Sequence, residues 1–522
     1  MKKIFSIILV LFICLTTAHG QKNIDAQMRK LLISTMTIND QYVDSVDTEK
    51  LVEDAIRGML EKLDPHSAYS TPEQTKRLNE PLNGSFDGIG IQFNLLDDTL
   101  MVIQTITGGP AEKAGIMAGD RIITAGDTAI SGVKMPQEDV MKKLRGPRGT
   151  NVKLCIMREG IDEMIYIDVT RDKIPLNSVD AAFMVTPWTG LIRFSNFAVT
   201  THDEVVEAIN KLKKQGMQNL ILDLTQNGGG YLQAAAEIAG EFLTEDDMIV
   251  YTKGRAYPPQ YFRSKGGNAF SKGKVTVLVD EYTASAAEIL AGAIQDQDRG
   301  IIVGRRTFGK GLVQRPINLP DGSMIRLTIS QYYTPSGRCI QKPYEKGKEK
   351  EYHMDVINRF NKGELTNADS IHFPDSLKYQ TLRKGRTVYG GGGIMPDYFV
   401  PLDTTKNTAL YRKIMAKRLP VNENLRYLAK HRAELTGKFP DFKSFRSSYK
   451  VPEELIDNIY SEAGESLTKN VTKEEKDKTT ALLKRILTAL TARDMWGMDE
   501  YFAIIYEDDD IVKKAVQLME EE

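Results

Sequence analysis

Two residues of the chain, Ser285 and Lys310, have the types and the surroundings that nucleophilic catalysis requires. Ser285 lies in the stretch 280–289 (DEYTASAAEI), and Lys310 lies between two glycines in 307–314 (TFGKGLVQ). A serine hydroxyl is a poor nucleophile unless a base takes its proton. A lysine amine can be that base only when it is neutral, which requires burial among apolar neighbours. The pair therefore predicts a hydrolase that works without histidine.

Each of the two residues also has a purely structural interpretation. A serine at the start of a helix usually caps that helix, and a lysine between glycines is common in an exposed turn. Phe308 and Leu312 give the lysine an apolar context that favours its burial. Gln314 could hold Lys310 through its amide if Gly311 allows a bend, because residues four apart on a straight strand lie roughly 13 Å from one another.

Three predicted strands lead to the chemistry-bearing residues. Residues 219–224 form a continuous apolar run that ends in a loop with Gly228, Gly229 and Gly230. A second run over 274–279 leads into Ser285 and a helix through residue 294, and a third over 301–304 ends just before Lys310. Apolar strands alternating with helices are typical of a covered α/β sheet. A fourth strand is predicted over 324–333.

The helix that begins after Ser285 offers a site for an oxyanion. Its first free amide is that of Ala286, and the positive end of the helix dipole lies there. Gly229 and Gly230 could supply a second donor, since glycine lets the backbone approach closely.

The composition excludes several classes of function. The chain has 522 residues, of which 41% are hydrophobic and 27% charged, and its net charge is -1. This length predicts three or four globular domains, and the balanced charge gives no global attraction to nucleic acid. No CxxC or HExxH pattern is present, so we expect no metal and no cofactor. Whether Cys155 and Cys339 pair is left open.

The N-terminal residues 1–20 have the pattern of a secretory signal peptide. Lys2 and Lys3 precede an apolar run over 4–15, and small residues precede a cut before Gln21. An uncut membrane anchor is the alternative, but the run is short for a bilayer. We therefore expect export to the periplasm or cell envelope of a bacterium, without stable membrane insertion after cleavage.

Residues 24–80 are predicted to be helical, with a break at Pro65. His66, beside that proline, is interpreted as a turn histidine because no partner motif lies nearby. Residues 84–172 instead contain a glycine-opened strand at 88–93, a helix near 136–144 and strands near 151–157 and 163–170.

Residues 84–172 resemble a PDZ domain. The resemblance rests on 88–91 (GIGI), 109–115 (GPAEKAG) and 118–120 (AGD). A dinucleotide-binding interpretation of the glycines fails because no helix follows them directly. PDZ domains bind a chain terminus as an added strand. The resemblance places the loop that receives the substrate carboxylate at Gly88, Ile89, Gly90 and Ile91.

The motifs together resemble the carboxyl-terminal processing proteases, which are serine endopeptidases with a Ser–Lys dyad and an inserted PDZ domain. Besides the serine and lysine motifs, the chain contains four further motifs of the family: 63–67 (LDPHS), 222–224 (LDL), 333–338 (YTPSGR) and 393–397 (GIMPD). All of them occur in the family's order, over about residues 40–400. The resemblance makes Ser285 the nucleophile, Lys310 the general base and Gln314 its orienting partner. It assigns the oxyanion hole to Ala286 with Gly229 and Gly230.

The expected fold is α+β and multidomain, with a ClpP- or crotonase-like α/β protease core, an inserted PDZ domain and helical N- and C-terminal regions. The expected parts are a signal peptide (1–20), a helical N-terminal region (21–83), a PDZ domain (84–172), a protease core (173–404, with an insertion at about 345–388) and a helical C-terminal region (405–522). The acidic C-terminal end is predicted to be solvated, and no function is assigned to it. Thr225 stands where the family usually has arginine, and Gly228 where it often has proline.

By resemblance, the chain is an exported serine endopeptidase that recognises and cleaves proteins at or near their C-terminal tails, gated by its PDZ domain. Its partners are protein and peptide tails, and homo-oligomer formation is left open. Arg145 matches an arginine implicated in coupling the PDZ domain to the active site, and a solvated turn arginine is the alternative. Two other functions remain possible interpretations of the sequence. One is an inactive PDZ scaffold on a protease-like core. The other is a crotonase-like acyl enzyme, and the expected export argues against this second one.

Overall fold

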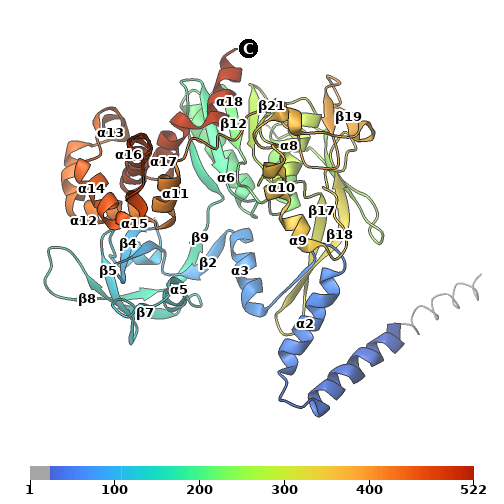
Figure 1. The fold of residues 1–522 in the computed structure, drawn as a ribbon, viewed down its shortest axis with the longest axis horizontal. Helices are drawn as coiled ribbons and strands as arrows, with labels where there is room; N and C mark the ends of the chain where they lie inside the picture. The colour runs from blue at the N-terminus through green and yellow to red at the C-terminus, as the bar shows by residue number, and fades with distance from the viewer. Residues whose placement is uncertain (1–23, 107, 268, 522) are drawn as a thin grey trace, which may run out of the picture. The chain divides into compact units, whose positions relative to one another are not determined.

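The computed structural model describes residues 24–106, 108–267 and 269–521. The signal peptide expected over residues 1–20 therefore lies outside the described residues. The chain divides into two compact units, of which the first contains the N-terminal part up to Thr75 with 314–328 and 344–353, and the second contains 76–313, 329–343 and 354–522. Figure 1 shows the order of the helices and strands along the chain.

The first unit begins with helices, as expected. Residues 24–41 are helical and are followed by α2 (Thr48–Glu61). The helical stretch is interrupted around Pro65, as predicted: α2 ends at Glu61, and the Asp64 carboxylate accepts hydrogen bonds from the amide and the hydroxyl of Ser67 in the turn that follows. Strand β1 (Ala68–Ser70) follows this turn and pairs antiparallel with the first residues of β18. A last helix, α3 (Pro72–Leu82), then leads into the second unit.

The PDZ-like segment forms a separate sheet with its own core. Its strands lie in the order β3-β4-β5-β7-β8, and β6 pairs with β5. The strands are β3 (Ile91–Leu96), β4 (Thr99–Thr105), β5 (Arg121–Ala125), β6 (Thr128–Ala129), β7 (Asn151–Met157) and β8 (Ile165–Thr170), and the helices are α4 (Pro110–Lys113) and α5 (Gln137–Leu144). The helix and the last two strands lie where the sequence predicts them.

The chain enters and leaves this segment through one two-stranded ribbon. β2 (Ser85–Gly88) pairs antiparallel with β9 (Asp172–Pro175), so that Ser85 faces Pro175. The prediction of a single strand over 88–93 is wrong in this detail. β2 ends at Gly88 and β3 begins at Ile91, because Gly90 has a positive φ of 78° that breaks the extended backbone.

The region expected to form the protease core contains a six-stranded sheet in the order β10-β11-β12-β15-β16-β21. Its strands are β10 (Val179–Met184), β11 (Thr189–Phe194), β12 (Asn219–Asp223), β15 (Val275–Val279), β16 (Ile301–Gly304) and β21 (Tyr398–Phe399). β10 is antiparallel to β11, and the other pairs are parallel. The ends of β12, β15 and β16 lead into the glycine loop, Ser285 and the Lys310 loop respectively. The sheet thereby brings the three predicted site segments to one edge.

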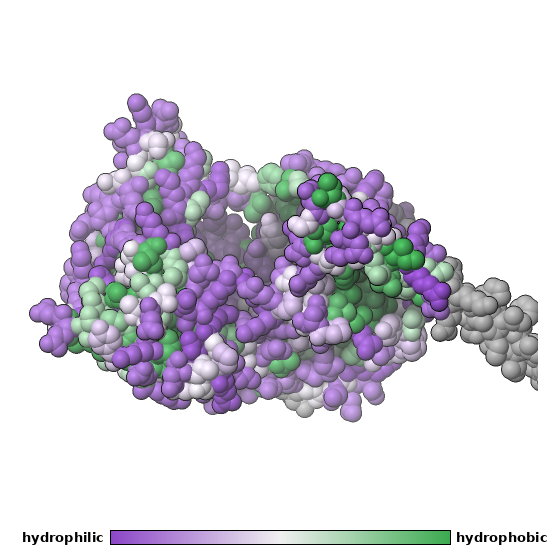
Figure 2. Space-filling model, turned by 90° about the horizontal axis from the view of Figure 1, so that it is seen from below, coloured by the Kyte–Doolittle hydropathy of each residue, from purple (hydrophilic) through white to green (hydrophobic). Residues whose placement is uncertain are grey.

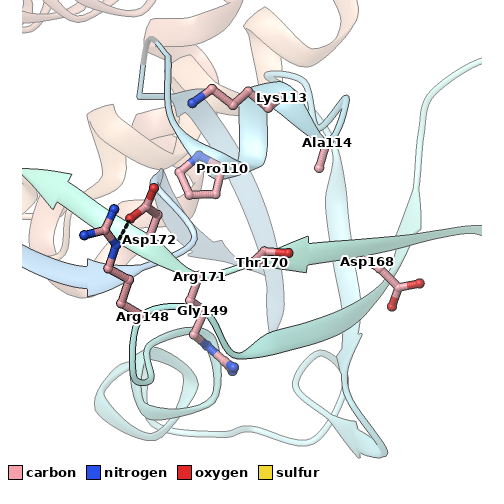
Figure 3. A pocket seen from close by; sticks show the side chains of 9 residues that line it. All are labelled: Pro110, Lys113, Ala114, Arg148, Gly149, Asp168, Thr170, Arg171 and Asp172. Atoms are coloured by element: carbon pink, nitrogen blue, oxygen red, sulfur yellow. Dashed lines mark ion pairs between the residues drawn. The ribbon is translucent and has the colours of Figure 1, made fainter.

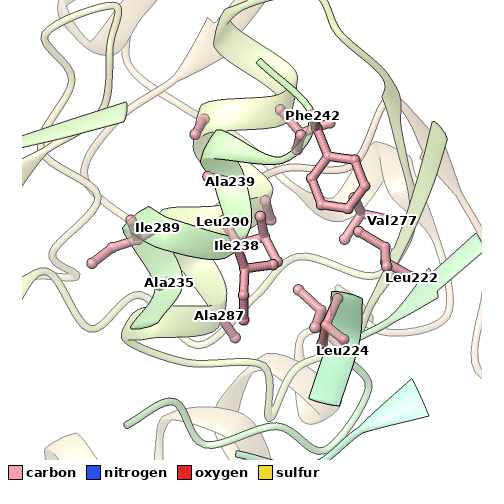
Figure 4. Close-up of a cluster of buried hydrophobic side chains, with 14 of the residues drawn as sticks. Leu222, Leu224, Ala235, Ile238, Ala239, Phe242, Val277, Ala287, Ile289 and Leu290 are labelled. Atoms are coloured by element: carbon pink, nitrogen blue, oxygen red, sulfur yellow. The ribbon is translucent and has the colours of Figure 1, made fainter. Parts of the chain in front are cut away.

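Helices cover one face of this sheet with apolar side chains. α6 (Thr201–Lys214), α7 (Leu232–Gly240) and α8 (Ala286–Asp296) pack on it. Figure 4 shows Leu222 and Val277 of the strands beside Ile238 and Leu290 of the helices. All four of these side chains are completely buried. The position of Ser285 is therefore fixed by a packed helix and not by a mobile loop.

A second sheet and an insertion complete the central region. β18 (Met324–Tyr333) pairs with β17 (Leu312–Asn318) and β13 (Met248–Lys253), and β13 also pairs with β14 (Gln260–Arg263). The insertion contains α9 (Glu349–His353), α10 (Asp355–Asn361), the 3-10 helices η1 (Ala368–Ser370) and η2 (Asp375–Leu377), and the hairpin of β19 (Lys378–Gln380) and β20 (Thr387–Tyr389).

The C-terminal region is helical, as expected. It contains α11 (Ala409–Ala416), α12 (Leu419–Lys438), α13 (Phe442–Ser448), α14 (Glu453–Ala463), α15 (Glu465–Thr468), α16 (Lys473–Met495), α17 (Met498–Ile505), η3 (Tyr506–Asp508) and α18 (Asp510–Glu520). The prediction that the acidic end is solvated is wrong for α18. Its Ile511, Val512 and Ala515 are buried in a cluster with Leu191 and Ile221 of the protease sheet. The helix is amphipathic, so it has an apolar face although it also contains acidic residues.

The surface and the cysteines agree with an ordinary globular protein. Figure 2 shows a face on which hydrophilic residues predominate and hydrophobic residues form scattered patches. Within the described residues, we find no helix that has both the length and the apolar character to cross a bilayer. Cys155 and Cys339 are both free, so they do not form the disulfide that the sequence left open.

Candidate active site

Ser285 has a strained backbone at the start of α8. Its φ is 59° and its ψ is -117°, a combination that side-chain-bearing residues rarely adopt. It precedes a fully buried helix, and its own side chain is half-buried. A sharp strand-to-helix turn of this kind presents a serine hydroxyl at the edge of a sheet, as in enzymes with a nucleophile elbow. The same residue also forms a capping box, in which the Glu288 side chain accepts from the Ser285 amide.

The glycine loop lies directly against Ser285. A Cβ atom added to Gly229 would lie 2.7 Å from the Cβ of Ser285 and 2.9 Å from the amide nitrogen of Ala286. Gly229 also has a positive φ of 95°. Only glycine fits this position, because the loop backbone contacts the turn that carries the serine. The structure therefore brings together Ser285, Ala286 and Gly229, as the sequence predicts.

The amides of the glycine loop are not equally available to a ligand. The Gly229 amide donates to the Oδ1 atom of Asn227 at 2.8 Å, and the Nδ2 of Asn227 donates to the carbonyl of Phe194 at 2.8 Å. Asn227 is completely buried. Gly230 is exposed and has a φ of 151°. The side chain of Asn227 thus fixes the loop and uses the Gly229 donor.

A buried carboxylate, that of Glu288, joins the serine turn to the lysine loop. Its Oε2 atom accepts from the amides of Ser285 at 2.8 Å and of Lys310 at 2.9 Å. Its Oε1 atom accepts from the Gly309 amide at 2.8 Å and the Thr307 hydroxyl at 2.5 Å. The side chain is completely buried. Glu288 therefore sets the backbone positions of both candidate dyad residues at once.

Other side chains hold the lysine loop from further along the chain. The hydroxyl of Tyr332 lies 3.0 Å from the carbonyl oxygen of Ser285 and also contacts the carbonyl oxygen of Lys310. The guanidinium of Arg359, on α10, donates to the carbonyl of Thr307 at 3.1 Å. Lys310 itself is half-buried. These contacts fix the backbone of the loop that carries Lys310.

Gln314 and His66 lie together in the first unit. The Nε2 atom of Gln314 donates to the backbone carbonyl of His66. The Nε2 atom of His66 lies 2.8 Å from the hydroxyl of Tyr352. The amide of Gln314 thus holds the turn that precedes β1, which the sequence did not indicate.

The PDZ loop is built around buried glycines, and Arg145 contacts it. Gly88, Ile89 and Gly90 are buried, and Ile91 is half-buried at the start of β3. The guanidinium of Arg145 lies 4.2 Å from the ring centre of Phe86. It also forms an ion pair at 2.7 Å with Glu80.

These contacts place Arg145 between the peptide loop and the helix that precedes the domain. Phe86 is on β2, whose last residue opens the loop, and Glu80 is on α3. The Arg145 side chain is nevertheless 37% exposed.

A hollow of about 380 Å³ lies elsewhere on the PDZ domain, between α4 and the last strands (Figure 3). Arg148 and Asp172 form an ion pair of 2.6 Å at its rim. None of its lining residues belongs to the loop at Gly88–Ile91 or to the surroundings of Ser285. Over the described ranges, no three His, Cys, Asp or Glu side chains gather closely enough to hold a metal ion.

Comparisons with known proteins identify the family. The model of peptidase family S41 matches residues 188–352, and that of a PDZ domain matches residues 88–169. A carboxy-terminal-processing protease of Bartonella bacilliformis is 36% identical over 330 residues, which cover 62% of this chain and 75% of that protein. The chain belongs to peptidase family S41. It is a serine-type peptidase with a PDZ domain, as the motifs predict.

Other proteins are also similar to this chain. The carboxy-terminal processing protease CtpB of Bacillus subtilis is 33% identical over 384 residues, which cover 71% of this chain and 78% of that protein. A solved structure of a photosystem II D1 C-terminal processing protease is 30% identical, covers 61% of this chain and 90% of its own, and has a TM-score of 0.33. Residues 14–74 match an N-terminal domain of the activating protease CtpB, and residues 410–497 match a family of unknown function.

Sequence reasoning missed Glu288 and Tyr332. Glu288 lies three residues after Ser285 in a helix start, where a glutamate suggests a capping box. This signal could have indicated its bond to the Ser285 amide, but not its bonds to the loop of Lys310. Tyr332 lies in a predicted strand and carries no motif of its own.

The burial of Glu288 leads to a pH-dependent contribution to stability. Burial raises the pKa of Glu288 from 4.5 to about 7, against the opposing effect of the hydrogen bonds that it accepts. Between these pH values the folded chain binds a proton that the unfolded chain has released. The contribution of this group to the free energy of unfolding is therefore fully present below pH 4.5. It is lost as the pH rises through about 7, by about 3 kcal/mol in all.

The melting temperatures of the wild type and of Glu288→Gln, measured from pH 4.5 to 8, check this expectation. The wild-type value minus the variant value should fall as the pH rises, because glutamine does not titrate. A difference that is constant over this range would contradict the prediction.

Proposed function

We propose that this member of family S41 is an exported endopeptidase that cleaves proteins at or near their C-terminal tails through an acyl-enzyme on Ser285. The observation that carries the proposal is the backbone cluster around Glu288. It binds the amides of Ser285 and Lys310 with one carboxylate oxygen, so the strained serine and the lysine are positioned by the same group. An inactive scaffold has no need of such an arrangement.

The roles of the residues follow from serine peptidase chemistry. Lys310, as general base, takes the proton of the Ser285 hydroxyl, whose oxygen attacks the scissile carbonyl carbon. The amide of Ala286 donates to the oxyanion that develops. We assign the second donor to Gly230, because the Gly229 amide is already bound by Asn227. Protonated Lys310 then gives the proton to the leaving amine, and a water molecule hydrolyses the acyl-enzyme. Gln314 is proposed to orient Lys310, on the resemblance alone.

The PDZ domain is proposed to receive the substrate's C-terminus. β3 is the terminal strand of its sheet, so it can take an added strand. The loop at Gly88–Ile91 precedes β3 and would receive the terminal carboxylate on backbone amides. The relatives named as carboxy-terminal processing proteases support this substrate class. The proposed partners are therefore protein tails, and no nucleic acid is expected.

Arg145 is proposed to couple tail binding to cleavage. Its ion pair with Glu80 and its contact with Phe86 link α3 to the peptide loop. We expect Arg145→Ala to lower kcat/KM about tenfold for a peptide with a free C-terminus. The same peptide with an amidated C-terminus should be cleaved equally by the variant and the wild type. Arg148→Ala is the matched control, because Arg148 is more exposed and pairs with Asp172. Equal losses for both peptides would contradict the coupling role.

Export is proposed from the signal-peptide pattern of residues 1–20. Cell fractionation of the source bacterium and N-terminal sequencing of the mature chain test it. A mature chain that begins at Gln21 in the envelope fraction is the expected result. A chain that retains Lys2 and Lys3 in the cytoplasm would contradict it.

The experiment that tests the function is cleavage of an unfolded protein with an apolar C-terminus by the wild type and by Ser285→Ala. A fluorophosphonate probe should in parallel label the wild type on Ser285, as located by mass spectrometry. If the wild type neither cleaves the protein nor is labelled, but still binds tail peptides, the proposal is replaced by the inactive PDZ scaffold.

A further inference from the structure

A cluster of buried polar side chains lies beneath the glycine loop, at the end of β12. Asp223 is 1% exposed, and its Oδ1 atom accepts from the amide of Thr225 at 2.8 Å and from the Thr225 hydroxyl at 2.7 Å. Thr225 is the second residue after β12 and begins the loop that continues to Gly229. The carboxylate of Asp223 therefore fixes the start of the loop that contacts Ser285.

The other carboxylate oxygen of Asp223 has two partners, Arg193 and Tyr506. The Nη1 atom of Arg193 donates to Oδ2 at 2.7 Å, and the hydroxyl of Tyr506 donates to the same atom. The Nη1 atom of Arg193 is also 3.0 Å from both the Tyr506 hydroxyl and the Thr225 hydroxyl. Four side chains thus form one closed network, which includes the first residue of the glycine loop.

Tyr506 reaches this network from the far C-terminal part of the chain. It lies in η3, beyond residues 410–497 that match the family of unknown function. α17 before it is fixed to β10, because Asp499 accepts from the Ala182 amide at 2.7 Å. α18 after it is buried against the protease sheet. The position of the tyrosine ring is therefore set by packing, and its hydroxyl adds a specific bond.

The electrostatics keep the Tyr506 hydroxyl protonated. Burial and the neighbouring Asp223 carboxylate raise the pKa of Tyr506 above its ordinary value. A neutral phenol donates a hydrogen bond to the carboxylate, whereas a phenolate would repel it. Phe502 of α17 lies beneath the guanidinium of Arg193, with 5.0 Å from Cζ to the ring centre. Two aromatic residues of the C-terminal segment therefore contact the ion pair.

We propose that Tyr506 is a positioning residue for the glycine loop, so that the C-terminal segment from Met498 to Glu520 forms part of the catalytic unit. This inference rests on the proposed function, in which the loop donates to the oxyanion beside Ser285. Loss of the Tyr506 hydroxyl leaves the Asp223 oxygen with Arg193 alone, which frees the carboxylate and Thr225 to shift. A shift of the loop weakens oxyanion binding more than it weakens substrate binding.

Tyr506→Phe tests the proposal, because it removes the hydroxyl and keeps the ring. We expect kcat for a peptide substrate to fall about tenfold, with KM within about twofold of the wild type. The affinity for a peptide aldehyde, which forms a tetrahedral adduct with the serine, should fall by a similar factor. Tyr460→Phe is the matched control, since Tyr460 lies in α14, outside this segment, and its hydroxyl bonds to Lys476 and Thr480 of α16. It should leave kcat and aldehyde affinity unchanged.

Two results would overturn the proposal. One is a Tyr506→Phe variant with wild-type kcat and aldehyde affinity. The other is a Tyr460→Phe variant with the same losses, which would indicate a general effect of losing a tyrosine hydroxyl in the C-terminal region. If Tyr506→Phe lacks a cooperative melting transition, Thr225→Val carries the same expectation, because it removes a hydroxyl of the network at the loop itself.

Labelling by a fluorophosphonate separates this inference from the proposed function. A wild type that is not labelled on Ser285 would refute the proposed function, whatever Tyr506→Phe does. A wild type that is labelled, together with an unchanged Tyr506→Phe, would refute only the role of Tyr506.

Discussion

Ser285→Ala and Lys310→Ala are each expected to lower kcat at least about 10⁴-fold for cleavage of an unfolded protein with an apolar C-terminus. Ser285 supplies the attacking oxygen, and Lys310 removes its proton, so neither can act without the other. The double variant should be no slower than either single variant, because residues that act as a unit do not have additive effects. Cleavage is followed by gel electrophoresis and by the rate of release of a fluorogenic peptide.

Ser271→Ala and Lys272→Ala are suitable controls, because both residues are exposed neighbours in one loop. They should retain wild-type activity. The melting temperatures of the Ser285 and Lys310 variants should stay close to that of the wild type, which shows that the loss is chemical. Retained cleavage in either dyad variant would refute the Ser–Lys mechanism.

Gly229→Ala is expected to abolish activity and to destabilise the fold, whereas Gly228→Ala should do neither. A methyl group on Gly229 would lie 2.7 Å from the Cβ of Ser285 and 2.8 Å from the carbonyl oxygen of Ala284. These atoms belong to a packed backbone and cannot move without shifting the serine. The positive φ of 95° adds backbone strain. Together these effects should cost about 3 kcal/mol of unfolding free energy and lower kcat by at least about 100-fold.

Gly228 provides the control within the same loop. A methyl group there meets no atom within 4 Å, and the residue is exposed. Thermal unfolding and kcat/KM of the two variants measure the contrast. Similar behaviour of the two variants would mean that the loop does not contact the serine turn in solution.

The sequence predicted the strands of the core and the helix after Ser285 because each has a strong local pattern. Residues 219–224 and 274–279 are apolar throughout and end at glycine or serine segments, and they became β12 and β15. The order of motifs then indicated the PDZ insertion and the site residues. Local pattern and motif order were enough to place Ser285, Ala286 and Gly229 together.

The remaining features depend on contacts between residues far apart in the chain. No local pattern pairs Asp223 with Arg193 or with Tyr506, and the bonds of Glu288 to the lysine loop exist only in the folded protein. α18 was misjudged because its acidic residues dominate the sequence, although its apolar face covers the sheet. Thr225, which stands where the family usually has arginine, has an arginine beside it in the folded chain. Its hydroxyl lies 3.0 Å from the Arg193 guanidinium, which reaches the loop from the adjacent strand β11.

The paired ribbon of β2 and β9 has a consequence for how such a chain can be rebuilt. Because Ser85 and Pro175 face each other across the ribbon, the chain enters and leaves the PDZ domain at adjacent positions. A unit with adjacent termini can be exchanged for another without stretching the chain that surrounds it. Another PDZ domain that keeps the apolar contact with Leu425 of α12 can therefore be grafted between these two strands.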